Sequence, residues 1–278
     1  MPAVAVVTDS TACLTPDLIA DSQVRVVPIE VIVDGQTLHD GVGIDCHEVA
    51  QAMLADKRVT TSRPAPQEFL TAYEAAAQEG AEAIVSIHLS GALSGTVESA
   101  RLAARDAPIP VTVVDSRTIG MGLGFAALNA ARAARQGAGL DEVVARGEAT
   151  AAGSNVVFYV DTLEFLRKGG RIGKASAWLG SALRVKPLLH VVDGEVAPLE
   201  KTRTSAKALA RLIDLAVEAA ATGQCQLAVQ HLNSPERAAD VAQQLSDRLG
   251  TQAVVCEVGA VVAVHVGPGV ISIAVAPE

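Results

Sequence analysis

The segment AIVSIHLSGALSGTVESARLAAR, residues 83–105, contains a strand, a glycine-containing loop and a helix in direct succession. Ala83–Leu89 is short, apolar and rich in β-branched residues, which is typical of a buried strand. Thr96–Arg105 has the apolar spacing of an amphipathic helix. A strand that leads directly into a helix predicts one unit of a parallel sheet covered by helices.

The same alternation continues on both sides of this segment. Further buried strands are predicted at Ala3–Val7, Val24–Val33 and Val111–Val114. Further helices are predicted at His47–Ala55, Gln67–Gln78, Gly122–Arg135 and Asp141–Ala151. We therefore expect residues 1–150 to form an α/β domain with a mostly parallel sheet between two helical layers. Ligands of such sheets bind beyond the carboxyl ends of the strands.

The second half of the chain has a different pattern, with more strands and fewer helices. Strands are predicted at Val156–Val160, Leu188–Val192, Gln226–Gln230, Val254–Val266 and Val270–Val275. Long helices are predicted only at Ser205–Ala220 and Pro235–Leu249. The turn Gly267-Pro268-Gly269 predicts an antiparallel hairpin between the last two strands. Residues 151–278 are thus expected to form an α+β domain with a mostly antiparallel sheet, and a ligand is expected between the two domains.

Composition and charge exclude some classes of partner. The chain has 278 residues, of which 50% are hydrophobic and 19% charged, so we expect a folded core. The formal net charge is -9, and only 3% of residues are aromatic. Nucleic-acid binding uses a basic face or stacking rings, so no nucleic-acid partner is expected.

Cysteine and histidine positions give no sequence signature of a metal or disulfide site. The four cysteines, without a CxxC pair, are Cys13, Cys46, Cys225 and Cys256. No metal-binding motif such as HExxH is formed by His39, His47, His190 or His231. We expect reduced thiols, no metal and no cofactor.

The longest apolar stretch, Ala253–Ala276, is interrupted by Glu257, His265 and the Gly-Pro-Gly turn, and no signal peptide is visible. The sequence therefore predicts a cytoplasmic protein without stable membrane insertion.

Three hydroxyl-rich segments follow predicted strands and lead into predicted helices: Thr8–Thr11, Thr60–Pro66 and His88–Thr96. In the simpler interpretation, these residues only cap the helices. In the functional interpretation, hydroxyls and free helix N–H groups bind an anionic group, with Asp9 and Ser10 at the ligand edge of the sheet. The GxSxG motif of hydrolases is absent around Ser94, which favours a hydrogen-bond donor over a nucleophile.

Two groups of cations stand out in the second half. The first, in Leu166–Gly173, comprises Arg167, Lys168 and Arg171 among three glycines, without the Walker spacing. It is either a solvated basic turn or a docking site for a phosphate or an acidic partner. The second group, expected to be a solvated face, comprises Lys201, Arg203 and Lys207. His265, in a predicted apolar strand, is by itself more often a core residue than a ligand.

Taken together and in order, six motifs resemble the DegV family of bacterial fatty-acid-binding proteins. The motifs are Thr8-Asp9-Ser10-Thr11, Asp40-Gly41, Thr61-Ser62-Arg63-Pro64, Leu89-Ser90-Gly91-Ala92-Leu93-Ser94-Gly95-Thr96, Arg167-Lys168-Gly169-Gly170-Arg171-Ile172 and His265-Val266-Gly267-Pro268-Gly269. They run from one end of the chain to the other. One position departs from the family pattern, because Arg63 stands where a glutamine often follows Thr-Ser.

The resemblance implies two α/β domains around one long-chain fatty acid, such as palmitate or a similar acid, carried for lipid metabolism. The ligand-binding residues that it implies are Thr61, Ser62, Ser94, Gly95 and His265. It further implies that the protein is not itself an enzyme and presents the carboxylate to a separate ATP-dependent fatty acid kinase. The residues implied in docking that partner or supporting the head group are Arg167, Arg171 and Arg203.

Two alternatives stay open at this point. One is a serine- or histidine-dependent hydrolase or an acyl- or phosphoryl-transfer enzyme, in which Ser94 or His265 is catalytic. The other is a lipid-sensing regulator that contacts another protein through Arg167, Lys168 and Arg171.

Overall fold

The computed structural model describes residues 2–178, 185–221 and 223–278. Its first sheet has four parallel strands in the order β2-β1-β6-β7. The strands are β2 (Arg25–Val27), β1 (Val4–Asp9), β6 (Ala83–His88) and β7 (Val111–Asp115). Every residue of β1 and β6 is buried, as expected for the central strands of a sheet that is covered on both faces.

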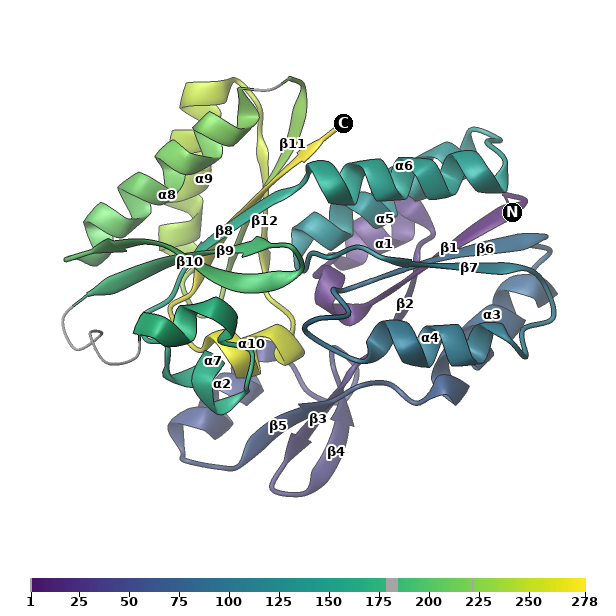
Figure 1. The fold of residues 1–278 in the computed structure, drawn as a ribbon, viewed down its shortest axis with the longest axis horizontal. Coiled ribbons are helices and arrows are strands. Elements are labelled where there is room, and N and C mark those ends of the chain that lie inside the picture. Colours follow the sequence, from purple (N-terminus) through teal and green to yellow (C-terminus); the bar gives the residue numbers. More distant parts are fainter. Residues whose placement is uncertain (1, 179–184, 222) are drawn as a thin grey trace.

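Helices cover both faces of this sheet (Figure 1). On one face lie α3 (Pro66–Gln78) and α4 (Thr96–Ala104), and on the other α5 (Met121–Arg135) and α6 (Leu140–Gly153). Alternate residues of β1 face opposite layers, because Val7 packs with Phe69 of α3 whereas Val6 packs with Leu123 of α5. The short helix α1 (Pro16–Ser22) packs against α5. The predicted parallel αβα arrangement is confirmed.

A second, three-stranded antiparallel sheet was not anticipated from the sequence. Its strands, in the order β4-β3-β5, are β4 (Gln36–His39), β3 (Glu30–Val33) and β5 (Val59–Ser62), and α2 (Cys46–Leu54) lies between β4 and β5 in the chain. The prediction of one strand over Val24–Val33 is therefore wrong. Pro28, which has no N–H to donate to a ladder, interrupts this segment, and the chain passes from the first sheet to the second. Thr61 and Ser62 consequently lie in a strand and not in a loop.

The third sheet has six strands in the order β10-β9-β8-β13-β11-β12, and only the β11–β12 pair is parallel. Its strands are β10 (Glu195–Thr202), β9 (Lys186–Val192), β8 (Asn155–Tyr159), β13 (Ile271–Pro277), β11 (Cys225–His231) and β12 (Ala253–Glu257). The helices α8 (Ser205–Ala220) and α9 (Pro235–Leu249) share an apolar cluster with residues of these strands. This confirms the predicted α+β half with a mostly antiparallel sheet.

The prediction of a strand over Val254–Val266 is wrong in its second part. The strand β12 ends at Glu257, and α10 (Ala260–Val266) follows. The buried carboxylate of Asp40 accepts hydrogen bonds from the N–H groups of Ala260 (2.7 Å) and Val261 (3.4 Å) at the start of this helix. A cap supplied from a distant part of the chain thus overrides the β-propensity of a valine-rich segment.

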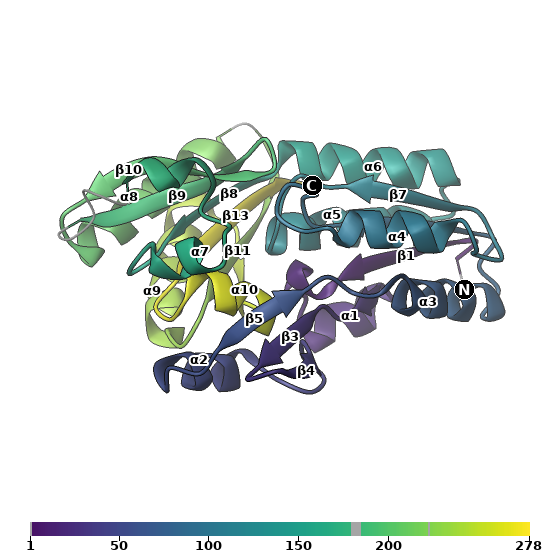
Figure 2. The same ribbon diagram turned by 60° about the horizontal axis from the view of Figure 1, so that its bottom comes forward.

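No hairpin forms at Gly267-Pro268-Gly269, because the turn ends α10 and β13 pairs instead with β8 and β11. Two further short elements complete the second half, α7 (Glu164–Lys168) and a 3-10 helix at Gly173–Trp178, and another 3-10 helix follows β1 at Ser10–Ala12. Figure 2 shows α7, α10 and β5 close together, and α10 contacts both α7 and β5. Within the described ranges, no helix combines the length and hydrophobicity needed to cross a membrane.

Candidate functional site

A cavity lies where the three sheets approach one another. Its walls come from β5, the loop before α4, α7, α10 and the strands β8, β11 and β13. The atom-free space amounts to about 900 Å³ when its opening to solvent is included. The part of this space that the centre of a water-sized sphere can reach amounts to about 90 Å³.

Apolar side chains form most of the cavity wall. The helix α10 contributes Val261, Val262 and Val266, and Leu166 of α7 lies beside them. The remaining apolar lining residues are Ile29, Leu89, Leu93, Ile119, Phe158, Val196, Val258 and Val270. Such walls favour an apolar ligand, because burying a methylene group stabilises a complex by about 0.8 kcal/mol.

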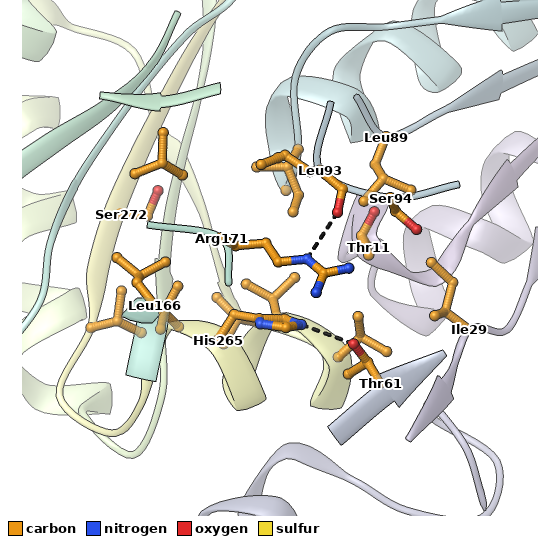
Figure 3. Close-up of a pocket in the computed structure, with 18 of the residues that line it drawn as sticks. Thr11, Ile29, Thr61, Leu89, Leu93, Ser94, Leu166, Arg171, His265 and Ser272 are labelled. Carbon is orange, nitrogen blue, oxygen red and sulfur yellow. Dashed lines mark hydrogen bonds between the residues drawn. The ribbon is translucent and has the colours of Figure 1, made fainter. Parts of the chain in front are cut away.

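Several polar side chains gather at one part of the cavity, whereas Ser272 lies apart from them (Figure 3). Thr61 Oγ1 lies 2.9 Å from His265 Nε2, and Ser94 Oγ lies 2.8 Å from Thr96 Oγ1. The Arg171 guanidinium extends between them, where Nε donates to Leu93 O at 3.0 Å and Nη1 donates to Gly169 O at 2.7 Å. The third nitrogen of Arg171, Nη2, makes no hydrogen bond to any described residue. The group therefore combines hydroxyl donors with the Arg171 cation, and the side chain of Arg63 also lines the cavity.

His265 is held in its neutral form. The enclosure of its ring, together with the nearby Arg171 cation, lowers the pKa of His265 to about 4. Its Nδ1 is buried and has no partner among the described residues. Gly169 packs directly against this ring, and a Cβ at position 169 would collide with Nδ1. The glycine of the Arg-Lys-Gly-Gly-Arg segment thus leaves room for His265 beside the cavity.

The structure brings together five of the site residues predicted from the sequence. The predicted residues that line the cavity are Thr61, Ser62, Ser94, His265 and Arg171. Gly95 is adjacent but does not line it, and the side chain of Arg63, which does, packs over Gly95. The expectation that His265 lies in a strand is wrong, because it lies in α10.

Arg167 and Arg203 lie outside the cavity. Arg167 is exposed on α7 and pairs with Glu164, where Nη2 and Oε1 are 2.5 Å apart. Arg203 is exposed in the connection between β10 and α8. The three arginines expected to act together are therefore separated, and Arg171 alone among them reaches the polar part of the cavity.

Asp9 and Ser10 lie at the carboxyl end of β1 but do not line this cavity. Asp9 is fully buried and accepts hydrogen bonds from Thr11 N (3.1 Å) and Leu89 N (3.0 Å). Ser10 Oγ accepts from Ile29 N at 3.1 Å. Thr11, the last residue of the same segment, lines the cavity.

A serine, a histidine and an aspartate are linked by hydrogen bonds elsewhere in the structure, but they do not line the cavity. Ser86 Oγ lies 2.6 Å from His88 Nε2, and His88 Nδ1 lies 3.0 Å from Asp9 Oδ2. All three side chains are completely buried, so this series joins β6 to β1 and has no access to a substrate. At the cavity itself, Ser94 and His265 bond to Thr96 and Thr61 and not to each other. A nucleophile–base pair of Ser94 and His265 is not formed.

Sequence reasoning overlooked two contributions to the cavity. Gln230 of β11 lines it and is almost fully buried; its Oε1 accepts from Met121 N at 2.9 Å, and its Nε2 has no partner among the described residues. The valines of α10 also line it, although their sequence pattern predicts a strand. Gly259 is the residue in the sequence that could have indicated a helix start, because glycine is a common N-cap residue and Gly259 caps α10.

One group of metal-ligand side chains lies outside the cavity. The ligand atoms of Cys46, His47 and Glu257 are all within 4.8 Å of one another. The spacing of these residues in the sequence gave no indication of this, because Glu257 is more than 200 positions from Cys46.

Comparisons with known proteins agree on one family. The model of the DegV family, described as an uncharacterised protein family, matches residues 3–278. A DegV domain-containing protein of Streptomyces coelicolor is 47% identical over 98% of both chains, and one of Deinococcus radiodurans is 42% identical over 99% of this chain and 98% of the relative.

Solved structures agree with this assignment. One described as fatty acid binding of a DegV family protein from Thermus thermophilus has a TM-score of 0.92 and 35% identity over 99% of both chains. Another, DegV, a fatty acid binding protein from Bacillus subtilis, has a TM-score of 0.91 and 32% identity over 99% of both chains.

Proposed function

The chain belongs to the DegV family, and from that premise we propose that it binds one long-chain fatty acid in the cavity and carries it for lipid metabolism. Palmitate or an acid of similar length is the proposed ligand. The observation that carries the proposal is a cavity with mostly apolar walls and a group of hydroxyls and a guanidinium at one part of it. A fatty acid likewise combines an apolar chain with one polar group.

The energetics of such a ligand suit the cavity. At about 0.8 kcal/mol for each buried methylene, a long acyl chain supplies on the order of 10 kcal/mol before the cost of ordering it. The polar part then has to replace the water around the carboxylate. Thr61, Ser94 and the Nη2 group of Arg171 offer donors for its two oxygens.

Neutral His265 has a positioning role in this proposal. With Nε2 protonated, its ring donates to Thr61 Oγ1, so that the Thr61 hydroxyl directs its own proton to the carboxylate. A protonated ring would add a second cation beside Arg171, which the low pKa of His265 prevents at neutral pH. The cations that line the cavity are then Arg171 and Arg63.

We further propose that the chain has no catalytic activity of its own and presents the carboxylate to a separate ATP-dependent fatty acid kinase. Attack of a carboxylate oxygen on the γ-phosphorus of ATP gives an acyl phosphate and ADP. Exposed Arg167 and Lys168 on α7, beside Arg171, support a role in docking that partner. Charge reversal of both residues is expected to slow acyl-phosphate formation without weakening fatty acid binding, and unchanged transfer would contradict this role.

Two further elements of the proposal concern organisation and location. We propose that residues 1–150 and 151–278 are the halves between which the ligand lies, which is supported by cavity residues from both ranges.

We also propose that the carrier works in the cytoplasm, which is supported by four cysteines that are unpaired in the structure.

Native mass spectrometry of the protein purified without added lipid tests the carrier function. We expect one co-purified fatty acid per chain, and calorimetry of the delipidated protein is expected to show saturable binding of palmitate. A protein that stays empty and does not bind palmitate would refute the proposal. Turnover of carboxylic or phosphate esters that is abolished in Ser94→Ala would favour an enzyme instead.

A further inference from the structure

Three potential metal ligands converge at the start of α2. Cys46 and His47 are the first two residues of this helix, and Glu257 is the last residue of β12. Glu257 Oε2 lies 3.4 Å from Cys46 Sγ and 3.0 Å from His47 Nε2. The group therefore joins the part of the chain around α2 to the six-stranded sheet.

The separations suit a small cation between these atoms. Zinc binds sulfur at about 2.3 Å, and imidazole nitrogen and carboxylate oxygen at about 2.0–2.2 Å. Tetrahedral angles then place nitrogen and oxygen about 3.4 Å apart, and sulfur and oxygen about 3.6 Å apart. The two spacings to Glu257 Oε2 are slightly shorter, and all three ligand atoms lie within 4.8 Å of one another.

The hydrogen bond made by Nδ1 of His47 leaves its Nε2 atom available to bind a metal ion. His47 Nδ1 lies 2.5 Å from Asn233 Oδ1, an acceptor that fixes the imidazole proton on Nδ1. In the neutral ring, Nε2 then carries a lone pair that faces the carboxylate of Glu257. Two lone pairs at this distance repel each other unless a proton or a metal ion lies between them. A histidine that binds a metal through one ring nitrogen usually donates a hydrogen bond from the other nitrogen to an oxygen acceptor.

The position of the carboxylate is also defined. Glu257 pairs in register with His231 on the parallel strand β11, and His231 Nδ1 lies 3.8 Å from Glu257 Oε1. Cys46 is buried, whereas the side chains of His47 and Glu257 are 50% and 36% exposed. An ion can thus enter from solvent, and water can complete its coordination.

We propose that Cys46, His47 and Glu257 bind a divalent zinc-type ion that fastens α2 to the edge of the six-stranded sheet. Thiolate, imidazole and carboxylate together are a donor set typical of zinc. Since α2 packs against α10, whose valines line the cavity, the ion stabilises one wall of the cavity without contacting its ligand (Figures 1 and 2). This site is independent of the proposed fatty acid function.

Titration of the chelator-treated full chain with zinc chloride, followed by calorimetry, tests the site. We expect one ion per chain and a loss of affinity of about tenfold or more in both Cys46→Ser and Glu257→Gln. Cys225→Ser, which changes a cysteine at the far end of β11, is the matched control and is expected to bind zinc as the unmodified chain does. Circular dichroism verifies that each variant is folded, and if Cys46→Ser does not fold, Glu257→Gln decides.

Cobalt chloride provides a second measurement. Bound cobalt is expected to give a thiolate-to-metal charge-transfer band in the near ultraviolet, and this band is expected to be lost in Cys46→Ser and retained in Cys225→Ser. The proposal is overturned if the chain binds no zinc, if binding is unchanged in Glu257→Gln, or if the cobalt complex shows no thiolate band.

Discussion

Replacement of Arg171 by methionine tests the contribution of a guanidinium that lies between Thr61 and Ser94 in the polar part of the cavity, whose wall also includes Arg63. Two of its nitrogens bind the carbonyl oxygens of Leu93 and Gly169, and Nη2 is left to bind a ligand. One hydrogen bond between charged partners contributes about 1.5–3 kcal/mol. We therefore expect Arg171→Met to weaken palmitate binding by about 10- to 150-fold.

Displacement of a fluorescent fatty acid from the delipidated protein measures this change. Arg167→Met is the matched control, because Arg167 belongs to the same basic segment but is exposed and paired with Glu164. It is expected to bind palmitate as the unmodified chain does. The long-chain alcohol of the same length, which has no carboxylate, is expected to bind both variants equally. Thermal unfolding verifies that Arg171→Met remains folded without its two carbonyl contacts.

The outcomes distinguish a head-group contact from a structural role. If Arg171→Met and Arg167→Met lose palmitate affinity equally, or if Arg171→Met loses the alcohol as well as the acid, then Arg171 does not bind the carboxylate. The assignment of the polar part of the cavity to the head group would then be wrong.

Three further predictions concern the same group of residues. Thr61→Val and Ser94→Ala are each expected to weaken palmitate binding about tenfold, because each removes one donor to the carboxylate, and unchanged calorimetric affinity in the double variant would exclude both. Gly169→Ala is expected to displace the His265 ring and weaken binding, whereas Gly139→Ala, where a Cβ meets open space, is not; equal affinities would contradict the packing argument. The pKa of His265 is lowered from 6.5 to about 4, so the unfolded chain takes up this proton first as the pH falls, and the associated stability is complete above about pH 6.5 and lost toward pH 4. As the pH falls through this interval, the unmodified chain is expected to lose about 3 kcal/mol more unfolding free energy than His265→Asn does, as measured by denaturant unfolding. Equal losses in the two proteins would contradict a depressed pKa of His265.

The parts of the fold that the sequence predicts well are those determined by local pattern. Ala83–Leu89 is β-branched and apolar, Thr96–Arg105 is amphipathic, and both form the expected elements with ends shifted by one residue. The break at Pro28 was visible in the sequence, but its consequence, a second sheet, depends on pairing with Val59–Ser62, which lies about 30 residues farther along.

The helix α10 shows why other parts were not predictable. Ala260–Val266 is valine-rich and reads as a strand, and its cap is the carboxylate of Asp40, which is 220 residues away in the sequence. The candidate site was only partly predictable for the same reason. Thr61, Ser94 and His265 follow from motifs, whereas the contribution of Gln230 depends on how β11 lies against the start of α5.

A crystal structure of the protein with palmitate tests the central proposal most directly. We expect the carboxylate within hydrogen-bonding distance of Thr61 Oγ1, Ser94 Oγ and Arg171 Nη2, with the acyl chain along the valines of α10. Palmitate bound elsewhere, or bound in the cavity with its carboxylate far from all three groups, would contradict it.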